Sequence, residues 1–191
     1  MLIGVDLDDT LADTMSALIN FHNDCYGTSL CKNKIVDLDY LALWQCSKEE
    51  TYTRFHRFFS TPYYENSVPQ EGSREIIKKL VKANELVIIT GRAVDVIAEQ
   101  TFFWLKKHFP GRFSNVYFVN DYAKDRDYKR IKTDICRRLG VDLLIDDSHE
   151  CVLDCAKNGI PAILFNQPWN QGYLPPAVPR TSSWSEIPDL L

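Results

Sequence analysis

The stretch GVDLDDTLAD, residues 4–13, carries an apolar run directly into a cluster of acidic side chains. Four carboxylates follow the apolar residues: Asp6, Asp8, Asp9 and Asp13. Carboxylates packed this closely repel one another and raise one another's pKa values. The stretch therefore predicts a strand that ends in a site, where the acids hold a cation or take part in a reaction. Taken alone, it also fits a solvated loop whose acids favour the start of a helix.

The bulk composition limits the classes of protein. The chain has 191 residues, which suits one domain with room for a small insertion. Its formal net charge of −4 leaves no basic footprint, so we do not expect stable binding to long nucleic acid. Its longest apolar runs are too short to span a bilayer, and no export signal is visible. We therefore expect no membrane contact and a cytoplasmic location.

Six cysteines are scattered along the chain: Cys25, Cys31, Cys46, Cys136, Cys151 and Cys155. Their spacings match no paired zinc or redox pattern, so we expect reduced thiols that mostly pack in the interior. Zinc held by the first three cysteines together with His22 is the less favoured alternative, because the close pairs of structural zinc sites are missing.

Alternating strands and helices predict the fold class. Continuous apolar runs predict strands covered on both faces, at residues 2–7, 86–90, 116–119, 142–146 and 161–165. Helical patterns lie between them, at residues 73–84, 94–108, 134–140 and 151–159. This alternation is typical of an α/β fold with a doubly wound, Rossmann-like parallel sheet, here of about five strands.

One long interval breaks the alternation, between the first strand and the helix at residue 73. Its aromatic-rich pieces, around residues 18–21, 40–44 and 52–59, are typical of helices. We therefore predict a small helical cap, residues 15–70, inserted after the first strand. Residues 1–14 and 71–191 then form the α/β core.

Polar side chains gather at the predicted carboxyl ends of the strands, where ligands bind in open parallel sheets. Acids end the first and fourth strands, a threonine followed by glycine ends the second, and a lysine precedes the helix that leads into the fourth. These residues are Asp6, Asp8, Thr90, Gly91, Lys132, Asp146 and Asp147. They lie far apart in the sequence, and we expect the fold to bring them to one edge of the sheet.

These residue types indicate phosphoryl chemistry. Three carboxylates without histidine form a hard oxygen site suited to Mg²⁺. A threonine hydroxyl, the Gly91 N–H and a lysine ammonium suit phosphoryl oxygens. A carboxylate beside such a group can attack it and form an acyl phosphate. A second acid two residues later can protonate the leaving oxygen and then deprotonate water.

The chain resembles the haloacid dehalogenase-like phosphohydrolase superfamily in four motifs that occur in the right order. DLDDT at 6–10 matches the D-x-D-x-T signature, and VIITGR at 87–92 supplies the threonine of the second motif. Lys132 in KTDICRRLG and the acids of LLIDDS at 143–148 resemble the third and fourth motifs. Each motif alone is weak, but four in order are specific.

The resemblance implies the roles of the acids. Asp6 is the nucleophile that forms an aspartyl-phosphate, and Asp8 is the general acid and base. Mg²⁺ is bound by Asp6, by the backbone carbonyl of Asp8 and by Asp146. Asp147 either binds the ion through a water molecule or supports the direct ligands without binding the ion itself. The insertion after the first motif corresponds to the superfamily's helical cap, which closes over the site.

The resemblance also implies the phosphate site. Thr90 and Lys132 hold the phosphoryl oxygens, with Gly91 beside them. Lys124 and Lys129 are alternatives to Lys132, which we prefer because it heads the helix leading into the fourth strand.

Three further residues are candidate substrate contacts: Arg92, Trp44 and Tyr40. Arg92 either forms a surface salt bridge or contacts the substrate phosphate. The cap aromatics, which include Tyr52 and Phe55, either stack a base or form the core of a helical bundle. Trp169 and Asn170 either shape the rim of the site or pin the proline-rich tail.

Asp8 and three motifs in the C-terminal half indicate which members of the superfamily the chain resembles most. Dehalogenases lack an acid at the position of Asp8, because halide leaves without a proton, so its presence favours phosphate esters. LLIDDS, NGIPAILF (158–165) and NQPWNQ (166–171) resemble the 5′(3′)-deoxyribonucleotidases of cytosolic type C and their bacterial and phage relatives. We therefore expect a phosphoric monoester hydrolase for a small phosphorylated metabolite, with a nucleotide as first candidate. A phosphatase of another metabolite, a phosphomutase and a non-catalytic binding protein remain alternatives.

Overall fold

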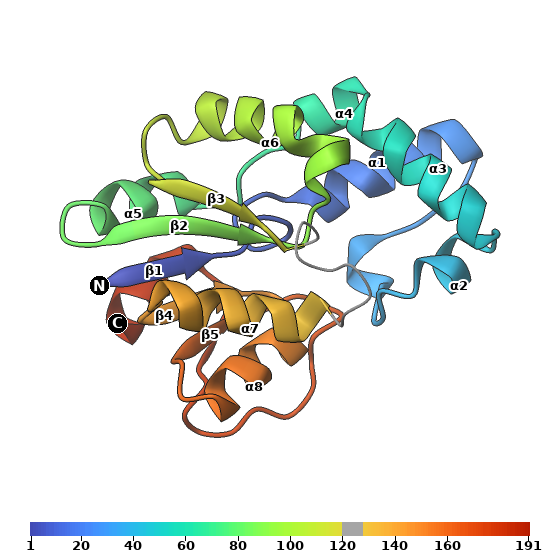
Figure 1. Ribbon diagram of the computed structural model, residues 1–191. Helices are drawn as coiled ribbons and strands as arrows, with labels where there is room; N and C mark the ends of the chain where they lie inside the picture. Colours follow the sequence, from blue (N-terminus) through green and yellow to red (C-terminus); the bar gives the residue numbers. More distant parts are fainter. Residues whose placement is uncertain (120–127) are drawn as a thin grey trace.

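The described residues form one parallel sheet whose strands lie in the order β3-β2-β1-β4-β5-β6 (Figure 1). The computed structural model describes residues 1–119 and 128–191. For residues 128–131 only the backbone is described. The strands are β1 (Leu2–Val5), β2 (Glu85–Thr90), β3 (Asn115–Phe118), β4 (Leu143–Asp146), β5 (Ala162–Phe165) and β6 (Arg180–Thr181). The predicted doubly wound parallel sheet is confirmed.

Strand β1 lies at the centre of the sheet and at its switch point. Ile3 is in register with Leu86 of β2 on one side and with Leu143 of β4 on the other. The chain crosses over in opposite directions from β1, and ligands bind at such a point in doubly wound sheets. The acidic loop that follows β1 therefore starts where the fold itself favours a site.

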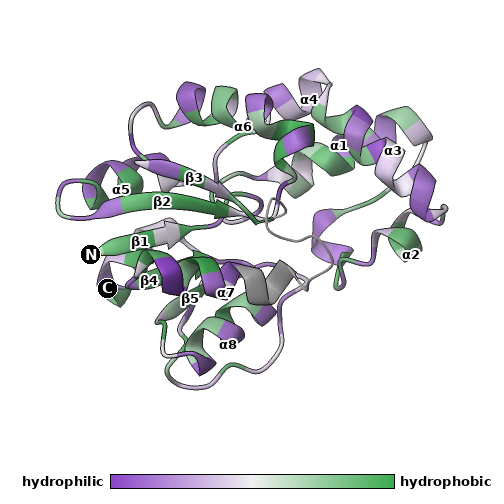
Figure 2. Cartoon of the chain, in the orientation of Figure 1, coloured by the Kyte–Doolittle hydropathy of each residue, from purple (hydrophilic) through white to green (hydrophobic). Residues whose placement is uncertain are grey.

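Helices cover both faces of the sheet, as its strand sequences require. The helices are α1 (Thr14–Tyr26), α2 (Tyr40–Trp44), α3 (Lys48–Phe59), α4 (Pro62–Glu65), α5 (Ser73–Leu80), α6 (Val94–His108), α7 (Tyr128–Leu139) and α8 (His149–Lys157), with 3₁₀ turns η1 (Lys32–Lys34) and η3 (Trp184–Leu190). Ile88 belongs to the apolar cluster that includes α5 and α6, and its neighbour Ile89 to the cluster that includes α7 and α8. Figure 2 shows β2 as almost wholly hydrophobic and α8 as mixed. This fits a strand that has helices packed on both of its faces and a helix that packs against the sheet on one face only.

Helices α1 to α4 fill the long interval between β1 and β2, to the right of the sheet in Figure 1. Phe21, Phe58 and Tyr64 of these helices are buried in the same apolar cluster that contains Ile3 and Val5 of β1. The hydrophobic core is therefore continuous from the sheet into the inserted helices.

Two helices differ from their predicted bounds by four residues or more, and one strand was not predicted. Helix α7 begins at Tyr128 rather than near residue 134, so Lys132 lies inside the helix and does not precede it. Helix α5 ends at Leu80, four residues early. Strand β6 was not predicted, because two residues carry no periodicity.

The C-terminal segment is ordered against the sheet and reaches the acidic loop. Trp184 of η3 is fully buried, and its Nε1 donates to the Thr10 carbonyl at 2.9 Å. Arg180 of β6 donates to the carbonyls of Asn170 and Gly172, each at 2.7 Å. These bonds fix the loop that follows β5 beside the loop that follows β1. Among the described helices, none is long and apolar enough to cross a membrane.

Candidate active site

The loop after β1, residues 6–13, turns tightly around Asp9. The Asp9 N–H donates to the Ala12 carbonyl at 2.7 Å, and the Ala12 N–H donates to the Leu7 carbonyl at 2.8 Å. Asp9 has a φ of 57°, in the left-handed region, which aspartate tolerates because its short polar side chain bonds locally. Here the carboxylate accepts from the Met15 N–H at 3.0 Å. The loop is therefore rigid on both sides of its turn.

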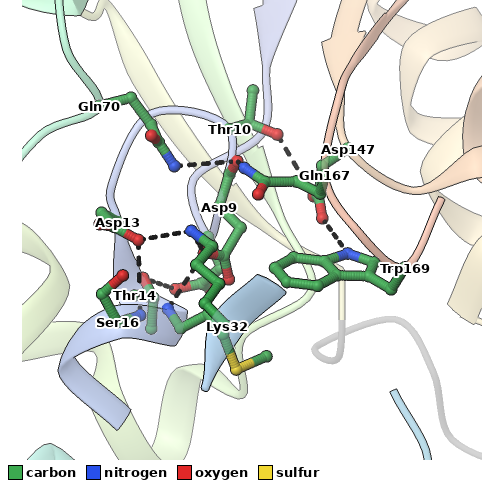
Figure 3. A network of polar contacts seen from close by, with 12 residues as sticks. Asp9, Thr10, Asp13, Thr14, Ser16, Lys32, Gln70, Asp147, Gln167 and Trp169 are labelled. Carbon is green, nitrogen blue, oxygen red and sulfur yellow. Dashed lines mark hydrogen bonds and ion pairs between the residues drawn. The ribbon is translucent and has the colours of Figure 1, made fainter. Parts of the chain in front are cut away.

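Side chains from distant segments hold the same turn (Figure 3). The Asp9 carbonyl accepts from Gln70 Nε2 at 3.2 Å and from Gln167 Nε2 at 2.5 Å. Lys32 Nζ donates to the carboxylates of Asp9 at 3.2 Å and Asp13 at 2.6 Å. Burial raises the pKa of Asp9 to about 7 although Lys32 opposes it. Sequence reasoning missed both glutamines, because no motif marks a side chain that acts through another segment's backbone.

A buried cluster of three carboxylates lies at the switch point. Oxygens of Asp6, Asp146 and Asp147 all lie within 4.8 Å of one another. Lys132 Nζ lies among them, 2.7 Å from Asp6 Oδ1 and 2.6 Å from Asp146 Oδ2. The Ser148 N–H donates to Asp146 Oδ1 at 2.8 Å. The structure thus brings together three acids and a lysine that the sequence spreads over 142 positions.

Asp147 is held through both of its carboxylate oxygens (Figure 3). Thr10 Oγ1 donates to Oδ1 at 3.3 Å, and Trp169 Nε1 donates to Oδ2 at 3.0 Å. Asn170 Nδ2 donates to the Asp147 carbonyl at 2.7 Å. Trp169 and Asn170 therefore lie at the site and orient one of its acids, and Asn170 also anchors to the tail through Arg180.

The charges of the cluster are unbalanced. Burial raises the pKa of Asp6 to about 7, and the charge of Asp146 adds to this, although Lys132 opposes it. Burial, followed by the charges of Asp6 and Asp146, raises the pKa of Asp147 well above its usual value. Burial lowers the pKa of Lys132, but the carboxylates of Asp146 and Asp6 outweigh burial and raise it. When all three carboxylates are ionised, the one ammonium leaves two negative charges uncompensated, and a divalent cation would balance them.

Asp8 belongs to a separate, internally neutral pair. Arg92 Nε donates to Asp8 Oδ2 at 2.8 Å, and Arg92 Nη2 donates to Oδ1 at 2.6 Å. Thr14 Oγ1 also donates to Oδ1, at 2.6 Å. Burial raises the pKa of Asp8, but the Arg92 guanidinium outweighs it and holds the pKa below its usual value. Arg92 is therefore neither at the surface nor exposed toward a phosphate: it is a buried partner of Asp8.

A cavity of about 680 Å³ opens over the acids. Its lining includes Asp6, Asp8, Gly91, Asp146 and Asp147 at the edge of the sheet, Lys132 of α7, Asp37 and Asp39 before α2, Tyr40 at the start of α2, and Trp169 and Asn170 after β5. Thr90 lies at the same edge but is fully buried, and its Oγ1 accepts from the Arg92 N–H at 3.3 Å. The size of the cavity is typical of small-molecule sites.

The two aromatic candidates differ in position. Tyr40 lines the cavity. Trp44 does not: the residue is 5% exposed, and its ring stacks on the His22 ring with 4.8 Å between the ring centres, in contact with Phe55. Tyr52, by contrast, is 60% exposed.

Two alternatives from the sequence remain to be compared with the structure: another lysine in place of Lys132, and a zinc site that includes His22. Lys124 and the side chain of Lys129 lie outside the described residues. His22 has both ring nitrogens engaged, Nδ1 with Thr28 Oγ1 and Nε2 with Arg54 Nη1, each at 2.9 Å. Cys25 and Cys31 are exposed free thiols. This arrangement does not present His22 to a zinc ion.

The sequence and the structure were compared with known protein families and with solved structures. The family model of the "5′ nucleotidase, deoxy (Pyrimidine), cytosolic type C protein" matches residues 1–191. The chain belongs to this family. The type C nucleotidase family lies within the haloacid dehalogenase-like superfamily, so the resemblance drawn from the four motifs is confirmed. The expectation that the chain is a phosphoric monoester hydrolase is confirmed with it.

Individual relatives of this type C nucleotidase family member are distant in sequence. Nucleotidase CA_C3379 of Clostridium acetobutylicum is 21% identical over 185 residues, which cover 97% of this chain and 90% of that protein. The haloacid dehalogenase-like family hydrolase SP0104 of Streptococcus pneumoniae matches with a TM-score of 0.73 at 14% identity, over 99% of this chain and 97% of that one. YfnB of Bacillus subtilis, solved bound to magnesium, matches with a TM-score of 0.67 at 16% identity, over 99% and 97%. These two structures confirm the fold.

Proposed function

We propose that this chain is a Mg²⁺-dependent phosphatase of small nucleotides, and that it acts through an aspartyl-phosphate on Asp6. The observation that carries the proposal is the pairing of two acids with opposite environments at one switch point. Asp6 lies in a carboxylate cluster with excess negative charge, whereas Asp8, two residues later, is paired with its own cation. The two carboxylates differ in basicity: burial raises the pKa of Asp6, whereas the Arg92 guanidinium outweighs burial at Asp8 and lowers its pKa, which favours the ionised form that can take a proton from water.

The residues present fit a magnesium ion. Asp6, Asp146 and Asp147 offer hard oxygen ligands, and the two negative charges that Lys132 leaves uncompensated match its charge. We propose that Asp6, Asp146 and the Asp8 carbonyl hold the ion and that Asp147 supports it. Bound there, Mg²⁺ would neutralise charge on the transferring phosphoryl group. The superfamily neighbour YfnB, which binds magnesium, supports this assignment.

The remaining steps belong to the chain's own side chains. An Asp6 oxygen attacks phosphorus while the bond to the leaving oxygen breaks, and Asp8 gives that oxygen its proton. Asp8 then takes a proton from water, whose oxygen attacks phosphorus and releases phosphate from Asp6. We propose that the Lys132 ammonium, which lines the cavity together with Gly91, holds a phosphoryl oxygen, whereas Thr90 is fully buried at the same edge of the sheet and does not line the cavity.

The proposed substrate is a nucleoside or deoxynucleoside monophosphate. The support is the nucleotidase family itself and the nucleotidase relative CA_C3379. We propose that residues 15–70 act as the cap over the site, since Asp37, Asp39 and Tyr40 of this segment line the cavity. Tyr40 is then the aromatic side chain placed to contact a base.

The test is phosphate release from a panel of 5′- and 3′-nucleotides, deoxynucleotides, sugar phosphates and p-nitrophenyl phosphate. Each is measured with Mg²⁺ and again with excess chelator. We expect release with Mg²⁺ that chelator abolishes, concentrated on nucleotides. Release only from sugar phosphates would contradict the proposed substrate, and a requirement for a bisphosphate activator would point to a phosphomutase.

Replacement of Trp169 by Phe is expected to weaken Mg²⁺ affinity by about 10-fold, because Asp147 Oδ2 loses its indole N–H donor and its orientation. The Phe ring keeps the packing of the indole over the loop. The measurement is the Mg²⁺ concentration that gives half-maximal activity, checked by the rise in Tm on Mg²⁺ addition. An unchanged Mg²⁺ dependence in a folded variant would show that Trp169 does not support the metal site.

A further inference from the structure

Arg92 connects the acid Asp8 to two helices. Its Nε and Nη2 hold the Asp8 carboxylate side-on, and its Nη1 donates to Tyr64 Oη at 2.6 Å and to Thr101 Oγ1 at 2.9 Å. Tyr64 lies in α4 and Thr101 in α6. The side chain is 3% exposed, and its guanidinium lies 5.8 Å from the centre of the Phe59 ring. All three nitrogens are thus engaged, so the guanidinium has a single, fixed orientation.

This pairing distinguishes the two oxygens of Asp8. Oδ1 accepts from Arg92 Nη2 and from Thr14 Oγ1. Among the described residues, Oδ2 accepts from Arg92 Nε alone. A carboxylate oxygen has two lone-pair positions. The Asp8 side chain is 33% exposed and lines the cavity, and one lone-pair position of Oδ2 is not used by the hydrogen bonds of the described residues.

We propose that Arg92 is a positioning residue for catalysis: it fixes the Asp8 carboxylate so that Oδ2 is the oxygen that delivers the proton to the leaving group. This inference rests on the proposed function, because it presupposes Asp8 as the general acid. In the step concerned, the Asp6–phosphorus bond forms, the bond from phosphorus to the leaving oxygen breaks, and the proton passes from Asp8 Oδ2 to that oxygen. Arg92 changes neither charge nor bonding.

The test separates proton delivery from binding by varying only the leaving group. Substituted phenyl phosphates, from phenyl phosphate to p-nitrophenyl phosphate, share one shape but release phenolates of decreasing basicity. The parameter is kcat/KM, which reports the phosphorylation of Asp6 and not the later hydrolysis. Its logarithm is plotted against leaving-group pKa for the wild type, for Arg92→Lys and for Asp8→Asn, each with Mg²⁺. Lysine keeps the charge but loses the side-on geometry.

We expect a shallow slope in the wild type and a steeper one in Arg92→Lys. The loss should be about 100-fold for phenyl phosphate and below about 10-fold for p-nitrophenyl phosphate, because nitrophenolate leaves without a proton. A parallel fall across the series, with the wild-type slope retained, would overturn the role of Arg92. If Asp8→Asn also kept the wild-type slope, the proposed acid would be wrong, which is a separate outcome.

A second, partly buried arginine provides the matched control. Arg54 has a side chain 14% exposed, and it bonds to Glu50 and His22 and not to Asp8. Arg54→Lys should leave the slope unchanged, which would show that an arginine-to-lysine change at another ion-paired position does not alter it by itself. A steeper slope in Arg54→Lys would overturn the specific role of Arg92. The Tm of each variant confirms that the compared proteins are folded.

Discussion

Replacement of Asp6 by Asn is expected to lower kcat by on the order of 10⁴-fold or more, because an amide cannot form the acyl phosphate on which the reaction depends. The fold should survive. Burial raises the pKa of Asp6 to about 7, so the carboxylate is itself poorly accommodated, and a neutral amide of the same shape removes its repulsion with Asp146. We therefore expect a Tm close to that of the wild type. The measurement is phosphate release with Mg²⁺ beside a thermal melt.

Asp9→Asn is the matched control for this change. Asp9 is also a buried carboxylate of the same loop, its pKa is also raised to about 7, and asparagine tolerates its positive φ. Its loss of kcat should be smaller than that of Asp6→Asn by at least about 100-fold, because no bond to phosphorus is assigned to it. Full activity in Asp6→Asn, once mass spectrometry excludes deamidation, would remove the aspartyl-phosphate from the mechanism. Equal losses in both variants would indicate a general effect of charge.

The edge of the sheet was predictable because its geometry follows from a local rule. Strands β1 to β5 each coincide with a continuous apolar run, and parallel strands place their carboxyl ends together. Asp6, Thr90 and Asp146 could therefore be brought to one place from their positions at the ends of three runs. The rule needs no knowledge of side-chain packing, so it held across the separation between β1 and β4.

Partners chosen by packing could not be predicted in the same way. Arg92 pairs with Asp8, 84 positions away, because Tyr64 of α4 and Thr101 of α6 hold its guanidinium beside the loop after β1, and no periodicity records that packing. Tyr40 and Trp44 lie one turn apart on α2, yet Tyr40 lines the cavity whereas Trp44 stacks on His22. Which aromatic ring faces the site depends on how α2 packs against α1. The sequence shows only that both rings are present.

The start of α7 shows the limit of periodicity as a signal. Residues 128–133 are mostly charged or polar, so an apolar stripe is visible only from about residue 134. The helix nevertheless begins at Tyr128, which places Lys132 within it. The expectation that Lys132 serves the site depended on its sequence position near β4, and the structure supplies the reason: the side chain lies between two acids of the cluster.

Replacement of Lys132 by Met is expected to affect stability and activity together. The ammonium bonds to Asp6 and Asp146, whose side chains are 8% and 1% exposed. Removing one partner of a buried ionic group leaves uncompensated charge, which typically costs about 3–5 kcal/mol. The free energy of unfolding, measured with denaturant in the presence of chelator, should fall by about that amount. Turnover with Mg²⁺ should fall by about 100-fold or more, because the phosphoryl group loses a cation.

Magnesium distinguishes this explanation from a simple packing defect. Without Lys132, all three negative charges of Asp6, Asp146 and Asp147 are uncompensated, so a divalent cation should bind the folded variant more favourably. Ligand that binds only the folded state raises its stability, so Mg²⁺ should raise the Tm of Lys132→Met by more than that of the wild type. A cavity left by the shorter side chain would instead lower the Tm equally with and without Mg²⁺. That result would show that Lys132 fills space and does not balance the charge of the acids.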